Sequence, residues 1–151
     1  MDIRFKKGLN RDNALLLCEW SNEKGKAFQE QWMGAGISYP LTCEKIKEMD
    51  NLFSIFNKGD FIGVIQEVRI DKDSIHIGRF LVDPRKTGRG FGTEALKGFV
   101  DFIFSDDNIK SISLAVFDFN QNAKKLYENL GFEIEEIIEA SKLKYIMRKH
   151  R

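Results

Sequence analysis

Three glycines at alternate positions are the strongest chemical signal in this 151-residue sequence. They lie in Thr87-Gly88-Arg89-Gly90-Phe91-Gly92-Thr93, between a strand-like run that ends at Val82 and a helical pattern that begins near Phe91. Such a loop can bring backbone N–H groups together, and the N-terminus of the following helix adds partial positive charge. Nearby cations are Arg85, Lys86 and Arg89. The segment is therefore predicted to bind a pyrophosphate.

Two other phosphate-binding loops are less compatible with the sequence. Gly90-x-Gly92-x-x-Ala95 fits the dinucleotide fingerprint formally, but that motif should open a βαβ unit with an acidic residue about 20 residues later. The next strand carries no acid before Asp118. The G-x-x-x-x-G-K-[ST] motif of nucleotide triphosphatases is absent. A nucleotide-binding oxidoreductase domain stays an alternative that a bound-nucleotide absorbance spectrum would reveal.

A second motif follows the glycine loop in Asn120-Gln121-Asn122-Ala123-Lys124-Lys125-Leu126-Tyr127-Glu128-Asn129-Leu130-Gly131-Phe132. Together the two segments resemble the GNAT superfamily of N-acetyltransferases, whose signatures read [QR]-x-x-G-x-[GA] after an apolar strand and a Pro, and N-x-x-A-x-x-L-Y-E-x-x-G-F. Both occur in the family's order, and the resemblance covers residues 60–149. One departure is Thr87, which stands where the family usually has Gln or Arg. The alternative register Arg85-x-x-Gly88-x-Gly90 has the Arg but leaves Gly92 unexplained.

The resemblance implies acetyl-CoA as the cosubstrate and no metal. The pyrophosphate would lie on Gly88–Gly92, and the pantetheine arm would pair with the backbone of Phe80, Leu81 and Val82 like an added strand. Asn120 would contact the pantetheine with its amide, a role compatible with capping the helix that follows.

Acetyl transfer also needs a proton donor for the departing thiolate and a base for the amine. Tyr127 is the candidate acid, because a phenol is protonated at neutral pH. A backbone N–H near Leu81 could stabilise the oxyanion. His76 and Glu67 are competing candidates for the base, and Glu19 and Asp118 stay open.

Hydrophobic periodicity predicts a mixed α+β fold of about seven strands, with helices on both faces of the sheet. The resemblance implies that this fold is of the GNAT type, with a central, twisted, mostly antiparallel sheet and a splay between the fourth and fifth strands. The predicted strands are 2–7, Leu52–Asn57, Phe61–Ile70, Ser74–Val82, Ser111–Phe117, Phe132–Ile138 and Leu143–Arg148. The predicted helices are Asn10–Trp20, Lys26–Met33, Cys43–Met49, 91–104 and Gln121–Leu130.

Composition favours one cytoplasmic domain over residues 1–151. The formal net charge of +1 gives no strong field for nucleic acid or anionic membranes. No apolar run is long enough for a signal peptide or a membrane span, and Cys18 and Cys43 lack metal-ligand spacing. We therefore expect no nucleic-acid, membrane or metal partner, and a homodimer is compatible with the sequence.

Two functions remain from this reasoning. The first is an acetyl-CoA-dependent N-acetyltransferase (EC 2.3.1 class) that modifies a primary amine of a small molecule or peptide by direct attack. The second is a catalytically silent CoA-binding sensor or partner domain of the same fold. The sequence does not identify the acceptor amine. The aromatic segment Gln31–Thr42 is expected to lie over the acceptor side of the cleft.

Overall fold

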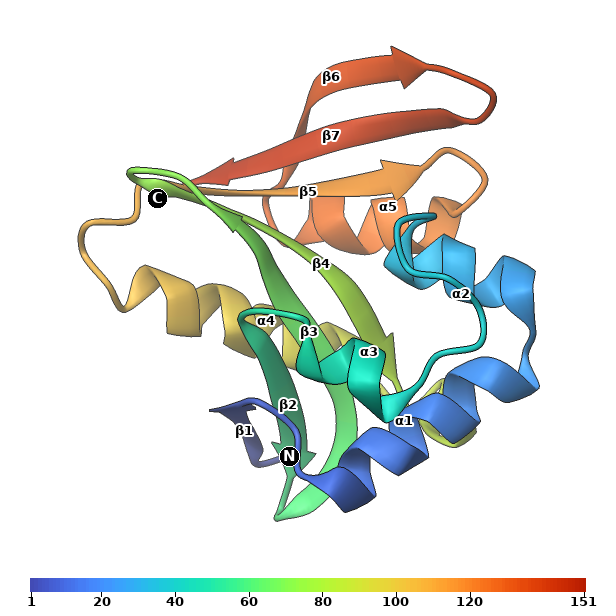
Figure 1. Cartoon of the computed structure of the whole chain (residues 1–151). Helices are drawn as coiled ribbons and strands as arrows, with labels where there is room; N and C mark the ends of the chain where they lie inside the picture. The colour runs from blue at the N-terminus through green and yellow to red at the C-terminus, as the bar shows by residue number, and fades with distance from the viewer. The chain divides into compact units, whose positions relative to one another are not determined.

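A computed structural model describes all of residues 1–151 and contains seven strands and five α-helices (Figure 1). The strands are β1 (Ile3–Lys7), β2 (Leu52–Asn57), β3 (Asp60–Ile70), β4 (Ser74–Val82), β5 (Ser111–Phe117), β6 (Glu133–Glu139) and β7 (Leu143–His150). The helices are α1 (Arg11–Glu23), α2 (Lys26–Met33), α3 (Cys43–Lys47), α4 (Phe91–Phe104) and α5 (Gln121–Asn129), with a 3₁₀ turn, η1 (Pro84–Lys86). The sheet order is β1-β2-β3-β4-β5-β7-β6. The predicted α+β class is confirmed.

The chain divides into two compact units. Residues 1–68 and 78–98 form the N-terminal unit, and residues 69–77 and 99–151 form the C-terminal unit. Strands β3 and β4 and helix α4 contribute residues to both units. That residues 1–151 act as one domain stays a prediction.

Helices cover both faces of the sheet in the N-terminal unit. Strand pairing places Phe5 opposite Ile55, and Ile55 opposite Gly63, so these residues share one face and Val64 lies on the other. Val64 belongs to a buried cluster with residues of α1, α2 and α3. On the opposite face, a Cβ placed on Gly98 of α4 would lie 3.3 Å from the Phe5 ring. The arrangement of helices on both faces was predicted.

Polar side chains define where the first helices begin. Asn10, predicted as the first helical residue, is instead the N-cap of α1, since its Oδ1 accepts a hydrogen bond from the Asn13 N–H at 2.8 Å. Helix α1 also continues beyond Trp20, the predicted end, because buried Ser21 accepts a hydrogen bond from the Trp32 indole at 2.9 Å. That contact is made by a residue of α2, so the spacing of apolar residues within α1 could not predict it.

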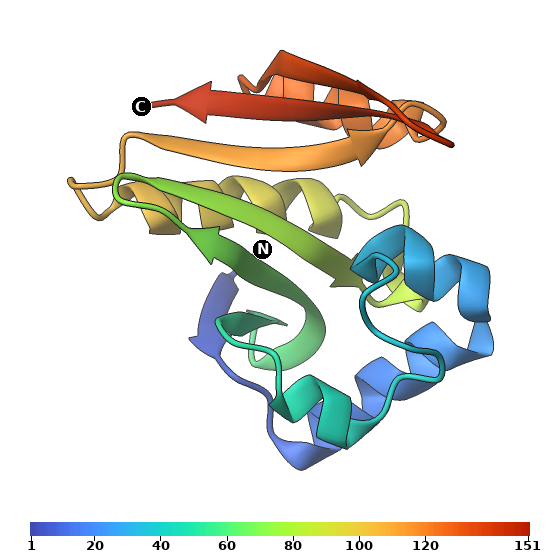
Figure 2. The ribbon, with the colours of Figure 1, turned by 45° about the horizontal axis from the view of Figure 1, so that its top comes forward.

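In the C-terminal unit, β5 lies between β4 and β7 (Figure 2). It runs parallel to β4 over Ser74–His76 and antiparallel to β7 along its whole length. Ile112, Leu114 and Val116 are buried at 0%, 4% and 5% exposure, as their alternation predicted. The divergence of β4 from β5 beyond this pairing stays a prediction. None of the helices is long and apolar enough to cross a membrane.

Candidate active site

The glycine loop has the backbone geometry of an anion-binding turn. Gly88 and Gly90 have φ of 77° and 80°, a left-handed conformation that glycine adopts without steric cost. The Gly90 carbonyl accepts from the Glu94 N–H at 3.1 Å, so α4 starts at Phe91, as predicted. The first N–H groups of a helix have no partner within it, and here they follow an exposed loop. This arrangement can hold a phosphate.

The junction between β4 and the loop is fixed by a buried carboxylate. Asp83 is 1% exposed and accepts hydrogen bonds from the backbone N–H and the guanidinium of Arg85, at 3.0–3.1 Å. Burial acts to raise the pKa of Asp83, but the hydrogen bonds from Arg85 outweigh it and the pKa is lowered. Arg85 therefore has a structural role in addition to the predicted one beside the phosphate.

The C-terminal end of β4 lies unusually close to β3. A Cβ on Gly63 would come within 2.3 Å of the Leu81 carbonyl oxygen, so only glycine allows this approach. The Asp83 N–H also donates to the Ile62 carbonyl at 2.7 Å. Phe80, Leu81 and Val82 are half-buried at this end of the strand. Their pairing with pantetheine stays a prediction.

Arg79 was missed by the sequence analysis and has the most unusual backbone of β4. Its φ of 45° is left-handed, which costs an L-residue roughly 1–2 kcal/mol. Its Nε donates to the Met33 carbonyl at 3.0 Å, and its Nη1 donates to Oε1 of buried Gln66 at 3.1 Å. The available signal was a charged residue directly before the apolar run Phe80-Leu81-Val82 at the end of the strand.

Gln66 and Arg79 also line a pocket of about 510 Å³. The other side of this pocket includes Gly36, Ile37 and Ser38, from the middle of the aromatic segment Gln31–Thr42. This part of the segment therefore contacts the same pocket as two polar groups of the sheet. Its predicted place over the acceptor stays a prediction.

Two substitutions of Arg79 should distinguish the free-energy cost of its left-handed backbone from the contribution of its side-chain hydrogen bonds. Arg79→Ala and Arg79→Gly both delete the guanidinium and leave Gln66 without this donor, so both should lose about 1–3 kcal/mol of stability. Because glycine tolerates the left-handed backbone, Arg79→Gly should be about 1 kcal/mol more stable than Arg79→Ala in urea unfolding. Equal stability of the two variants would show that the φ of residue 79 contributes no strain.

The two predicted bases lie on neighbouring strands. Glu67 is on β3, four residues beyond Gly63, and its pKa is raised by burial, with the Lys7 charge opposing the shift. His76 is on β4, five residues before Leu81. The role of either side chain as the base stays a prediction.

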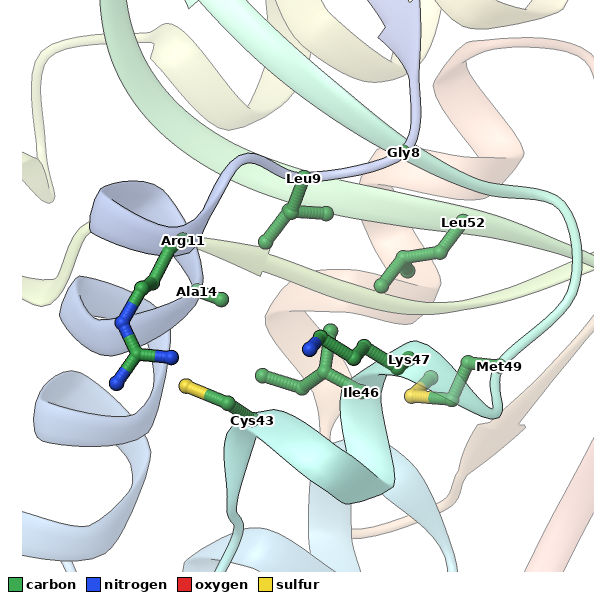
Figure 3. Close-up of a pocket in the computed structure, with 9 residues that line it drawn as sticks. All are labelled: Gly8, Leu9, Arg11, Ala14, Cys43, Ile46, Lys47, Met49 and Leu52. Carbon is green, nitrogen blue, oxygen red and sulfur yellow. The ribbon is translucent and has the colours of Figure 1, made fainter.

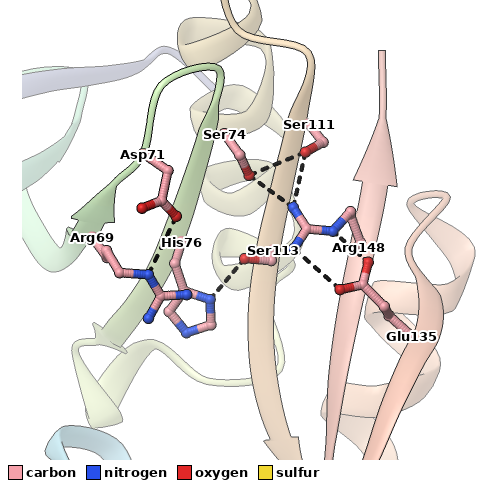
Figure 4. Close-up of polar contacts among 8 residues, drawn as sticks. All are labelled: Arg69, Asp71, Ser74, His76, Ser111, Ser113, Glu135 and Arg148. Atoms are coloured by element: carbon pink, nitrogen blue, oxygen red, sulfur yellow. Dashed lines mark hydrogen bonds and ion pairs between the residues drawn. The ribbon is translucent and has the colours of Figure 1, made fainter.

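His76 and a separate polar network around Arg148 lie in the C-terminal unit (Figure 4). Its Nδ1 lies 2.8 Å from Ser113 Oγ. Burial lowers the pKa of His76, and the charges of Arg69 and Arg148 act in the same direction. Arg148 bonds to Glu135 and donates to Ser74 and Ser111 at 2.7 and 2.9 Å. Because these residues come from four strands, the network links β4, β5, β7 and β6.

Helix α5 positions Asn120 and Tyr127. Asn120 caps the helix, since its Oδ1 accepts from the Ala123 N–H at 3.3 Å, and its NH₂ group stays available for a ligand. The Tyr127 ring is half-buried and meets the Phe132 ring edge-on at 6.2 Å. Burial raises the pKa of Tyr127, so its phenol is protonated at neutral pH. Gly131, with φ of 96°, ends the helix as predicted.

The comparison with known proteins agrees with this geometry. The sequence profile of the Acetyltransferase (GNAT) family matches residues 15–132. Spermidine N(1)-acetyltransferase of Escherichia coli (strain K12) is 26% identical over 139 residues, which cover 89% of this chain and 69% of that protein. Spermine/spermidine N(1)-acetyltransferase of Bacillus subtilis (strain 168) is 28% identical over 86 residues, which cover 52% of this chain and 57% of that protein. The chain thus matches little more than half the length of the Bacillus relative.

Solved structures show the same fold. The crystal structure of spermidine N-acetyltransferase from Vibrio cholerae in complex with CoA and spermine matches with a TM-score of 0.77 and 18% identity. The match covers 99% of this chain and 95% of that one. The chain therefore belongs to the Acetyltransferase (GNAT) family. The family and the fold predicted from the two motifs are confirmed.

Proposed function

We propose that the chain is an acetyl-CoA-dependent N-acetyltransferase whose acceptor is a primary amine. The observation that carries this proposal is the exposed loop of left-handed glycines, Gly88 and Gly90, at the N-terminus of α4 in a member of the GNAT family. The loop supplies backbone donors for the pyrophosphate, and Arg89 adds an exposed positive charge.

Direct transfer requires few side chains. The neutral amine attacks the thioester carbonyl carbon, the C–N bond forms, and the C–S bond breaks. In our proposal a backbone N–H at the end of β4, near Leu81, stabilises the oxyanion. Tyr127 gives its phenol proton to the departing thiolate. His76 and Glu67 stay the competing candidate bases for the ammonium proton, with a water chain as the alternative acceptor.

A polyamine is the acceptor class that we propose first. The two relatives described above are named for spermidine and spermine acetylation. Within this chain, the pKa of Arg85 is raised, chiefly by its hydrogen bond to Asp83. The negative charges of Glu19 and Glu23 on α1 raise the pKa of Arg85 further. Acidic groups on α1 thus lie near the C-terminal end of β4, where they could attract a polycation.

Acetyl-CoA should stabilise the folded chain. A ligand that binds only the folded state at about 100 times its dissociation constant adds about 2.7 kcal/mol. For a chain of this length, that corresponds to a rise in Tm of roughly 5–10 °C in a thermal melt. NADH serves as the control and should give no comparable shift. The absence of a shift with millimolar acetyl-CoA, together with a silent calorimetric titration, would contradict the proposed cosubstrate.

Turnover distinguishes the enzyme from a silent CoA-binding domain. Thiol release from acetyl-CoA would be measured with spermidine, spermine, amino acids, aminoglycosides and lysine peptides. The fastest turnover is expected with polyamines. Binding of acetyl-CoA without turnover on any of these amines would favour the sensor, an alternative that stays open because the general base is not assigned.

A further inference from the structure

A second pocket lies in the N-terminal unit and shares no residue with the proposed acetyl-CoA site (Figure 3). Its volume is about 310 Å³, at the lower end of the range for small-molecule sites, about 300–1,000 Å³. The loop after β1, the first turns of α1, helix α3 and the start of β2 enclose it. The lining residues are Gly8, Leu9, Arg11, Ala14, Cys43, Ile46, Lys47, Met49 and Leu52.

The wall of this pocket is apolar and well ordered by packing. Ala14, Ile46 and Leu52 are buried at 5%, 5% and 3% exposure and belong to the main core cluster of the unit. Leu9 and Met49 pack against the same cluster and are half-buried. The cavity is therefore bounded by fixed core residues, which can receive an apolar group without rearranging.

All the charge in the lining is positive. Arg11 and Lys47 are exposed, and neither forms an ion pair or a side-chain hydrogen bond. Figure 3 shows the Lys47 side chain, from α3, next to Ile46, and the Arg11 side chain, from α1, at the edge of the pocket on the side of Cys43. No Asp or Glu lines the cavity. Helix α1 begins at Arg11, so its positive end also faces this region.

From this combination we infer that the pocket binds a small amphipathic anion, a monocarboxylate with an apolar chain. The chain would occupy the space between Leu9, Ile46 and Leu52, and the carboxylate would pair with Arg11 and Lys47. Burial of the chain supplies affinity, and the two cations select the charge. This ligand is opposite in charge to the amine acceptor, so the pocket is a separate site.

Cys43 provides a direct report on occupancy, because its thiol lines the pocket. The other cysteine, Cys18, reacts less readily, since burial and then the neighbouring Cys43 raise its pKa to about 11. Modification by N-ethylmaleimide, a neutral reagent, is followed by mass spectrometry of the peptide that contains Cys43. Mass spectrometry of the wild-type peptide that contains Cys18 measures any separate reaction there.

Octanoate is the probe, and three compounds separate its features. Octylamine has the chain with the opposite charge, octanamide has the chain without charge, and acetate has the charge without the chain. Octanoate is expected to slow modification of Cys43 at least about 5-fold at saturation and to titrate in calorimetry. Octanamide should bind more weakly, and octylamine and acetate should give no protection at the same concentration.

Substitutions then test the two cations. Arg11→Gln and Lys47→Gln should each weaken octanoate binding about 3- to 10-fold, and the double variant should bind octanoate no better than octanamide. Lys26→Gln, an exposed position on α2 outside the pocket, makes the same change in net charge and should bind like the wild type. Circular dichroism melts establish that each variant is folded.

Three results would overturn the inference. Octanoate could leave the modification rate of Cys43 unchanged up to its solubility limit. Octylamine could protect Cys43 as well as octanoate does. The Arg11 and Lys47 variants could bind octanoate as tightly as Lys26→Gln does. None of these measurements depends on acetyl transfer, so their outcome is independent of the proposed function.

Discussion

Replacing Tyr127 by Phe is expected to lower kcat by roughly 10²–10⁴-fold while the affinity for acetyl-CoA changes little. The substitution removes the phenol proton that we assign to the leaving thiolate. It keeps the ring, whose edge-on contact with Phe132 should survive, so Tm should stay close to that of the wild type. Steady-state kinetics with the best acceptor amine, together with a thermal melt, measure both quantities.

Tyr145→Phe is the matched control for this prediction. Its hydroxyl donates to Asp118 Oδ1 at 2.6 Å, so the variant should lose this hydrogen bond and keep its kcat. The pH dependence adds an independent check. Because burial raises the pKa of Tyr127, loss of rate through its deprotonation is expected only above about pH 10. A near-normal kcat in Tyr127→Phe would assign the thiolate proton to water instead.

Gly90→Glu is expected to abolish acetyl-CoA binding, with a loss of at least about 100-fold in affinity. The new side chain would place bulk and negative charge where the backbone must approach the pyrophosphate. Packing does not explain glycine here, because the nearest atom to an added Cβ is Met1 Cε at 3.8 Å. Calorimetric titration of acetyl-CoA and the ligand-induced shift in Tm measure the effect.

Gly59→Glu is the control for the stability lost when a side chain is placed on a left-handed backbone. Gly59 has φ of 86°, close to the 80° of Gly90, and nothing lies within 4 Å of an added Cβ. Both variants should therefore lose a similar 1–2 kcal/mol of stability, and only Gly90→Glu should lose the ligand. Normal acetyl-CoA binding by folded Gly90→Glu would show that the pyrophosphate lies elsewhere.

The sequence by itself determined the elements whose signals are local. Strand β4 begins and ends at Ser74 and Val82, as its apolar run predicted, and α4 starts directly after Gly90. Asn120 and Gly131 bound α5 because a side-chain cap and a left-handed glycine act on adjacent backbone. Two motifs of this kind in the right order were sufficient for the family, since each depends on a few consecutive residues.

The tertiary structure decided which distant groups meet. Arg79 reaches Gln66 and the Met33 carbonyl, which lie 13 and 46 residues away in the chain, and periodicity carries no signal for such contacts. The cationic pocket joins Arg11 to Lys47 only because α3 packs against α1. Local propensity fixes where elements begin and end, whereas side-chain packing between elements fixes which atoms can react or bind together.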